Sequence, residues 1–201
     1  MWRLFYNIVL LLVSPVILTV LLAKQRCRRG LLQRLGVEEG SSGLSCLFGL
    51  FGFSEQDKRK KPDQPNKPLQ SVIWIHAVSL GEVVAVTPLV KELQHRHPEH
   101  RIVVSTVTET GREAVEQRLA AVAEHCYAPL DFPWVVSRFI GRLQPCLYVF
   151  VETELWPNLL WHLRRRGVPT VLVNGRLSTR SFTRQQWAPV RSFYRTMLQG
   201  L

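Results

Sequence analysis

The fold of this chain is decided by the stretch Leu147-Tyr148-Val149-Phe150-Val151-Glu152-Thr153-Glu154-Leu155-Trp156-Pro157-Asn158. Its first part, up to Val151, is an apolar, β-rich run typical of a buried strand. Pro157 suits the first turn of a helix, where its missing N–H has no partner to lose. Two carboxylates, Glu152 and Glu154, therefore stand between a strand and a helix. Ligands of open α/β sheets bind at such positions, so both side chains are candidates for chemistry.

The alternation of strand and helix repeats along residues 71–201. Apolar runs predict strands at Val72–Ala77, Ile102–Thr106, Cys126–Tyr127, Leu147–Val151 and Thr170–Asn174. Helical spacing predicts helices at Val83–Leu93, Gly111–Ala123, Pro133–Leu143 and Pro157–Arg166. This pattern predicts an α/β fold, a Rossmann-like parallel sheet with flanking helices on both faces and the strand order 3-2-1-4-5.

The predicted strand order makes the first and fourth strands neighbours. Glu82, which follows the first strand, is then expected to meet Glu152 at the mouth of one crevice. Gly81 beside it leaves room for a ligand. Structural alternatives exist for two of the acids: Ser79 and Glu82 fit a capping box, and Glu154 could serve only to cap the helix that follows it.

The ends of two other predicted strands carry polar side chains. After the second strand come Thr108, Gly111 and Arg112, and a helix start with glycine and arginine is a ready anion site. After the fifth strand come Asn174 and Arg176. A solvated loop would explain either group alone. Together, at the same sheet edge as the carboxylates, they predict a pocket for a sugar or a phosphate.

Composition limits the function classes. The net charge is +11, and the basic residues concentrate at the two ends of the chain while the middle is mildly acidic. Basic ends suit an anionic membrane surface or a phosphorylated ligand. No nucleic-acid-binding motif accompanies them, so nucleic acid is not expected as a partner.

Cysteines and histidines give no sign of a metal centre. The four cysteines are widely spaced without a C-x-x-C pair, which favours reduced thiols. The histidines of residues 95–100 are typical of a solvated turn. We therefore predict no metal site.

The amino terminus has the pattern of a membrane anchor. Leu4–Ala23 is uncharged and near the length that spans a bilayer. Because five basic residues follow it within residues 24–34 and only Arg3 precedes it, the positive-inside rule predicts that the rest of the chain lies in the cytoplasm. A single uncleaved anchor, either a clean span or a shallow or tilted one, is favoured over the alternative of a cleaved signal peptide. We expect residues 1–35 to form the anchor and its basic flank, and residues 36–70 an irregular linker or insertion whose apolar part could rest at the membrane surface or have no role.

Four segments resemble the amino-terminal half of the Kdo transferases, which act on 3-deoxy-D-manno-octulosonic acid (Kdo). These segments are Trp74–Glu82, Thr106–Gly111, Glu152–Asn158 and Asn174–Ser178, in the order and spacing of that family. The resemblance implies the two-domain GT-B fold, with residues 71–201 as the acceptor-binding domain. It also implies transfer of Kdo from CMP-Kdo to the lipid A precursor at the cytoplasmic face of the inner membrane, with no metal or other cofactor.

The resemblance implies roles for individual residues. Glu82 would be the proton acceptor, and Glu152 would stabilise the transition state. The residues expected to bind substrate are Ser79, Gly81, Thr108, Gly111, Arg112, Glu154, Asn174 and Arg176. Of these, Arg112 and Arg176 are expected on charge grounds to hold acceptor phosphates.

The sequence departs from the family in length. Kdo transferases are about twice as long, and their second half holds the CMP-sugar site. We therefore expect the isolated chain to transfer little or nothing without a separate donor-binding carboxyl-terminal half. The alternative is a non-catalytic, membrane-anchored module that binds the acceptor lipid.

Overall fold

The computed structural model describes residues 2–23, 31–35, 71–152, 154–176, 182 and 186–198. The strands are β1 (Val72–His76), β2 (Arg101–Thr106), β3 (Glu124–Tyr127), β4 (Pro145–Val151) and β5 (Thr170–Val173). The helices are α1 (Trp2–Ala23), α3 (Leu31–Arg34), α5 (Leu80–Arg96), α6 (Glu109–Leu119), α7 (Pro133–Leu143), α8 (Pro157–Arg165) and α10 (Ala188–Leu198). The residues predicted as linker, 36–70, lie outside this description.

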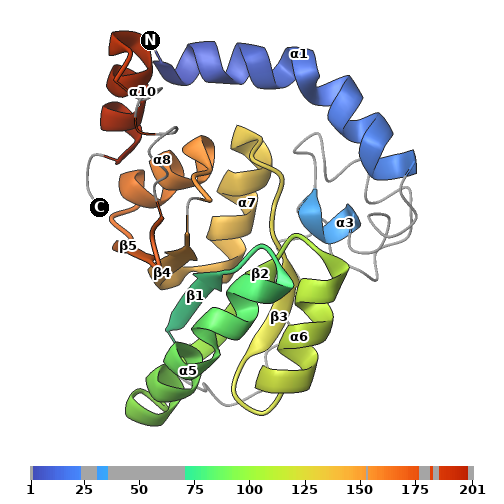
Figure 1. The fold of residues 1–201 in the computed structure, drawn as a ribbon, viewed down its shortest axis with the longest axis vertical. Helices are drawn as coiled ribbons and strands as arrows, with labels where there is room; N and C mark the ends of the chain where they lie inside the picture. Colours follow the sequence, from blue (N-terminus) through green and yellow to red (C-terminus); the bar gives the residue numbers. More distant parts are fainter. Residues whose placement is uncertain are drawn as a thin grey trace, which may run out of the picture.

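The strands form one parallel sheet in the order β3-β2-β1-β4-β5 (Figure 1). The predicted Rossmann-like order is therefore confirmed. Strand β1 lies at the centre between β2 and β4, and all its residues are buried. Burial on both faces explains why this strand reads as a continuous apolar run rather than an alternating one.

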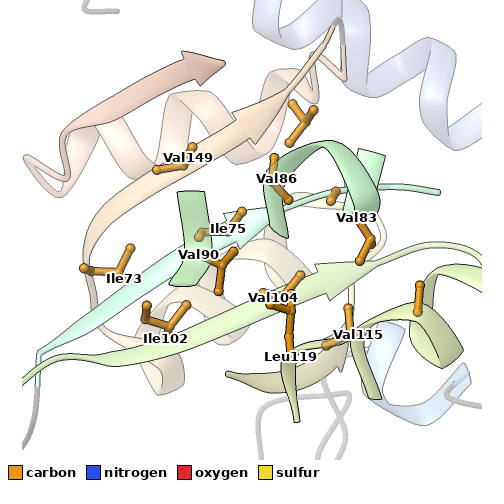
Figure 2. Close-up of a cluster of buried hydrophobic side chains, with 13 residues drawn as sticks. Ile73, Ile75, Val83, Val86, Val90, Ile102, Val104, Val115, Leu119 and Val149 are labelled. Carbon is orange, nitrogen blue, oxygen red and sulfur yellow. The ribbon is translucent and has the colours of Figure 1, made fainter. Parts of the chain in front are cut away.

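Helices α5 and α6 cover one face of the sheet (Figure 2). Branched aliphatic side chains of β1 and β2, such as Ile75 and Val104, pack there against Val83 and Val90 of α5 and Val115 of α6. β-branched residues suit this surface because their restricted rotamers pack well on a pleated sheet.

Helices α7, α8 and α10 cover the other face, where the core is more aromatic. Trp74, Tyr148 and Phe150 extend from β1 and β4 and are almost completely buried. The Trp74 and Tyr148 rings meet edge to face, with centroids 4.7 Å apart. Helix α10 adds Met197 to this core, so the carboxyl end of the chain is part of the packed domain.

Helix α1 forms where the anchor was predicted, but the prediction of a membrane span is wrong. Within the residues that the structure describes, no helix combines the length and apolarity needed to cross a bilayer. Polar residues interrupt the apolar run, and two near its start, Tyr6 and Asn7, bond to the folded domain. Trp2 likewise donates to Ser192 of α10, at 3.0 Å, so the start of α1 lies beside α10 (Figure 1). The inner-membrane localisation with a single amino-terminal anchor, which rested on that span, is wrong with it.

Two glycines in first helical turns should respond in opposite ways to alanine. A Cβ on Gly111 would lie 3.0 Å from Thr108 Oγ1 and 3.1 Å from Thr106 Cβ, whereas a Cβ on Gly81 would meet nothing within 4 Å. We expect Gly111→Ala to lower the free energy of unfolding by about 1–3 kcal/mol because of overpacking. Gly81→Ala should raise it by roughly 0.5 kcal/mol through the entropy of the unfolded chain. Urea titration measures both, and equal effects would contradict the packing described for Gly111.

Candidate active site

Glu82 sits in the first turn of α5 and is only 8% exposed. Its Oε2 accepts the backbone N–H of Val78 at 2.8 Å, and its Oε1 accepts the hydroxyl of Ser79 at 3.0 Å. The capping box considered for this turn is not formed, since the Ser79 side chain makes no cap bond to the helix. Instead the hydroxyl donates to the carboxylate, so Ser79 and Val78 orient Glu82.

The surroundings of Glu82 make it a stronger base than an ordinary carboxylate. Burial is the main cause that raises its pKa. The bonds from Val78 and Ser79 oppose this effect, and the charges of Glu154 and then Glu152 add to it. Glu82 is therefore within electrostatic reach of both acids that follow β4. A carboxylate with a raised pKa is suited to accept a proton from a substrate hydroxyl.

Glu152 follows directly on β4 and has a left-handed backbone, with φ of 59°. Its N–H donates to Val173 O at 3.0 Å, which ties the residue to β5. A non-glycine residue in this conformation costs of order 1 kcal/mol or more, and such strain gathers at functional sites. This backbone feature supports a functional role for Glu152, and it was not predicted from the sequence.

Glu154 does not cap the helix that follows it. Its Oε2 accepts the indole N–H of Trp156 at 3.3 Å, and Trp156 is the N-cap residue of α8. The backbone N–H groups of Asn158 and Leu159 are instead taken by the carboxylate of Asp131, at 3.0 and 2.9 Å. Sequence reasoning missed Asp131, because its place just before Pro133 resembles the start of α7 rather than a cap for α8.

His76, the last residue of β1, supports this region from within the core. It is fully buried, and its Nδ1 lies 2.9 Å from Ser105 Oγ, which also accepts the indole N–H of Trp74 at 2.8 Å. Among the described residues, its Nε2 has no hydrogen-bond partner. The imidazole meets the Trp156 ring edge to face, with centroids 5.4 Å apart. Sequence reasoning missed this role of His76.

The loop after β2 is built mainly for structure. Thr108 is the N-cap of α6, and its Oγ1 accepts the N–H of Gly111 at 3.1 Å. The same hydroxyl donates to Val78 O at 3.2 Å, which ties this loop to the one that holds Glu82. Thr108 and Gly111 therefore shape the site edge, whereas substrate contact by either residue stays a prediction.

Arg112 already has acidic partners. Its guanidinium lies 2.6 Å from Glu109 and 2.5 Å from Glu116, at the i−3 and i+4 positions of the same helix. Tyr127 also donates its hydroxyl to Glu109. A phosphate would have to compete with these carboxylates for Arg112.

The end of β5 presents an open polar segment. Asn174 has a left-handed backbone, with φ of 52°, a conformation that asparagine tolerates better than most residues. Asn174, Gly175 and Arg176 are exposed. Because β5 pairs with β4, this segment leaves the sheet beside Glu152.

At the opposite edge of the sheet, three residues of the turn between α5 and β2 could hold a metal ion. The ligand atoms of His97, Glu99 and His100 lie within 4.8 Å of one another, and Glu99 contacts the two imidazoles at 3.5 and 2.9 Å. Two of the three side chains are exposed. The expectation of no metal site stays a prediction.

The site residues predicted from the sequence all follow the carboxyl ends of β1, β2, β4 and β5. These four strands are consecutive neighbours in one parallel sheet. This edge is where α/β sheets bind ligands. Fold and site together define a Rossmann-like domain with a cluster of carboxylates at its binding edge.

Comparison with known proteins identifies the family. The sequence profile of the 3-deoxy-D-manno-octulosonic-acid transferase (Kdo transferase) family matches residues 48–201. A 3-deoxy-D-manno-octulosonic acid transferase of Haemophilus influenzae is 38% identical over 98% of this chain and 41% of that protein. A probable mitochondrial one of Arabidopsis thaliana is 36% identical over 69% of this chain and 31% of its own length. One of Bordetella pertussis is 38% identical over 60% and 29%.

This chain belongs to the Kdo transferase family. The resemblance found in the sequence segments is therefore confirmed. The chain spans about two fifths of the length of the Haemophilus influenzae relative, 41%.

Burial of His76 should make the protein sensitive to acid. Burial lowers its pKa from 6.5 to about 4, so between these values the unfolded chain binds a proton that the folded one excludes. Stability therefore falls as pH drops through this window, by roughly 3 kcal/mol in all. In His76→Asn the free energy of unfolding, measured by urea titration from pH 7 to 4, should fall less steeply.

His125, whose pKa burial also lowers to about 4, is present in both proteins and cancels in the comparison. The same substitution at the exposed His95 is the control, and an unchanged slope in His76→Asn would refute the assignment.

Proposed function

We propose that this chain is the acceptor-binding half of an inverting glycosyltransferase, and that this half carries the general base. The reaction would transfer Kdo from CMP-Kdo to the lipid A precursor in lipopolysaccharide biosynthesis. One observation carries the proposal: in a member of the Kdo transferase family, the buried Glu82 follows β1 and Glu152 and Glu154 follow the paired strand β4, so all three acids lie at the binding edge of the sheet.

In the proposed reaction, Glu82 accepts the proton of the acceptor hydroxyl while that oxygen attacks the anomeric carbon of Kdo. The new C–O bond forms as the bond to the phosphate of CMP breaks, and CMP leaves with the electron pair. A single displacement inverts the anomeric centre. The bonds from Val78 and Ser79 hold the carboxylate in one orientation, and burial raises its pKa toward the range of an effective base.

Glu152 is proposed to stabilise the transition state. Positive charge develops on the donor sugar as the leaving group departs, and a fixed carboxylate near it lowers the barrier. The backbone of Glu152 is held by the bond to Val173, so its position is set before substrate binds. Glu154, tied to Trp156, is proposed to contact substrate beside it.

The donor site is proposed to lie in a second, carboxyl-terminal half of a GT-B enzyme. The chain covers 41% and 31% of the length of the two relatives from Haemophilus influenzae and Arabidopsis thaliana, which supports a donor half outside the matched region. No metal or other cofactor is proposed, because basic groups and backbone dipoles can stabilise a departing nucleotide monophosphate.

Surface chemistry near α1 supports an acceptor with apolar and anionic parts. A groove of about 470 Å³ between α1 and α10 is lined by apolar side chains, including Phe5, Val9 and Phe193. It adjoins, at Trp2, a second pocket whose lining includes Arg3 and other arginines. A phosphorylated lipid has both kinds of surface. Attraction of the basic chain ends to an anionic membrane surface stays a prediction.

Removing the proposed base should abolish transfer. With the chain supplied together with a carboxyl-terminal half from a relative, Glu82→Gln should lower the turnover of CMP-Kdo and a lipid A precursor by about 10²–10⁴-fold. Glu113→Gln, at an exposed position on α6, is the matched control and should leave turnover unchanged. Full turnover in Glu82→Gln would discard Glu82 as the base.

The same assay decides between the enzyme and the alternative, a non-catalytic fragment that binds the acceptor lipid. We expect no transfer by the isolated chain and transfer once the second half is added. Binding of the acceptor without transfer in either case would favour the fragment. Complementation of a strain deficient in Kdo transferase, with and without the second half, repeats the comparison in cells.

The two candidate phosphate ligands should differ. Arg176 is exposed, whereas Arg112 is held by Glu109 and Glu116. We expect Arg176→Ala to raise the acceptor KM roughly fivefold, the factor that corresponds to about 1 kcal/mol, and Arg112→Ala to raise it less. Steady-state kinetics with varied acceptor measures both. An unchanged KM in both variants would remove these residues from the acceptor site.

A further inference from the structure

Asp131, in the loop between β3 and α7, is 9% exposed and bonds to the start of α8. Its Oδ2 accepts the N–H of Asn158 at 3.0 Å, and its Oδ1 accepts the N–H of Leu159 at 2.9 Å. These are among the N–H groups that a helix cannot satisfy internally. Trp156, the N-cap residue of α8, makes no side-chain cap bond, so Asp131 supplies the cap from 27 residues away.

Helix α1 contributes to the same cluster. The Tyr6 hydroxyl donates to Asp131 Oδ2 at 2.8 Å. The side-chain amide of Asn158 donates to Asn7 Oδ1 at 2.7 Å and to the backbone oxygen of Asp131 at 2.6 Å. Tyr6, Asn7, Asp131 and Asn158, here named the latch, thus join α1, the β3–α7 loop and α8.

The latch closes one end of the loop that carries the acids. Residues 152–156 connect β4 to α8. At the first end, the Glu152 N–H is bonded to Val173 O. At the other end, α8 begins at Pro157, and the Asp131 carboxylate accepts the N–H groups of the next two residues, Asn158 and Leu159. The loop is therefore fixed at both ends, once by the sheet and once by the latch.

We propose that Asp131, held by Tyr6, is a positioning residue that sets Glu154 and Glu152 against Glu82. The catalytic meaning of this inference rests on the proposed function, in which those carboxylates act on substrate. Helix α1 then helps to hold the active site in place, because loss of the Tyr6 hydroxyl loosens the loop that carries Glu152 and Glu154.

The pKa of Glu82 reports the position of that loop. The charges of Glu154 and Glu152 raise this pKa, so a loop that moves away should lower it. The measurement is a ¹³C NMR titration of side-chain carboxyls in the 201-residue chain, with the Glu82 signal assigned by its absence in Glu82→Gln. Tyr6→Phe removes one hydroxyl and keeps the ring.

We expect the pKa of Glu82 to fall in Tyr6→Phe and in Glu154→Gln, and to stay unchanged in Tyr194→Phe. Tyr194 is the matched control because it packs on the same face of the domain from α10. An unchanged pKa in Tyr6→Phe would overturn the proposal. So would an unchanged pKa in Glu154→Gln, since the loop would then not face Glu82.

Hydrogen exchange gives a second, independent readout. At pH 7.5, above the pKa of about 6 to which burial raises Asp131, the carboxylate accepts its three bonds. The amides of Asn158 and Leu159 should exchange about tenfold faster in Tyr6→Phe, corresponding to about 1.4 kcal/mol. Asp131→Asn should show a larger effect at the same amides. Faster exchange confined to residues 2–23 would show that α1 docks without holding the loop, and would overturn the proposal.

Neither measurement requires transfer of a sugar. Failure of the latch therefore leaves the Glu82→Gln assay to decide the proposed function. Conversely, full activity in Glu82→Gln would reject the proposed function while the titration still shows whether the latch positions the loop.

Discussion

The parallel pairing of β1 with β4 is the constraint on which the candidate site depends. Ile75 pairs with Val149 and His76 with Phe150, and β4 runs one residue further, so both strands end at the same edge of the sheet. The chain leaves β1 toward Glu82 and leaves β4 at Glu152. Two acids that are far apart in sequence are thereby brought to one edge of the sheet by strand pairing. The two carboxylates carry like charges, so attraction between their side chains does not place them there.

In the part of the chain that the structure describes, neutral donors rather than cations bond to the carboxylates of Glu82, Glu154 and Asp131. Glu82 receives an N–H and a hydroxyl, and Glu154 receives an indole N–H. Asp131 receives two backbone N–H groups and a phenol. Neutral donors orient a carboxylate without cancelling its charge. The same chemical group thus serves as a candidate base on α5 and as a helix cap at α8.

Sequence reasoning predicted the sheet well because its strands are dense in β-branched residues and its helices carry local start signals. Pro133 begins α7 as predicted, and Pro157 begins α8. Side-chain contacts between distant segments outside the sheet were not predictable. No residue near Asp131 in the sequence indicates that its carboxylate caps α8. The apolar residues of α1 do not indicate which surface of the protein they pack against. The pairing of Arg112, by contrast, was readable from Glu109 and Glu116 at helical spacing.

The left-handed backbone of Glu152 makes stability and chemistry favour different residues at that position. Glycine adopts this conformation without steric cost, so selection for stability alone favours glycine there. Under the role proposed for Glu152, selection for chemistry would retain the carboxylate. A library of variants at this one residue, ranked once by thermal resistance and once by sugar transfer, would then give different best variants, and the difference between the two rankings would measure the folding free energy that the carboxylate costs.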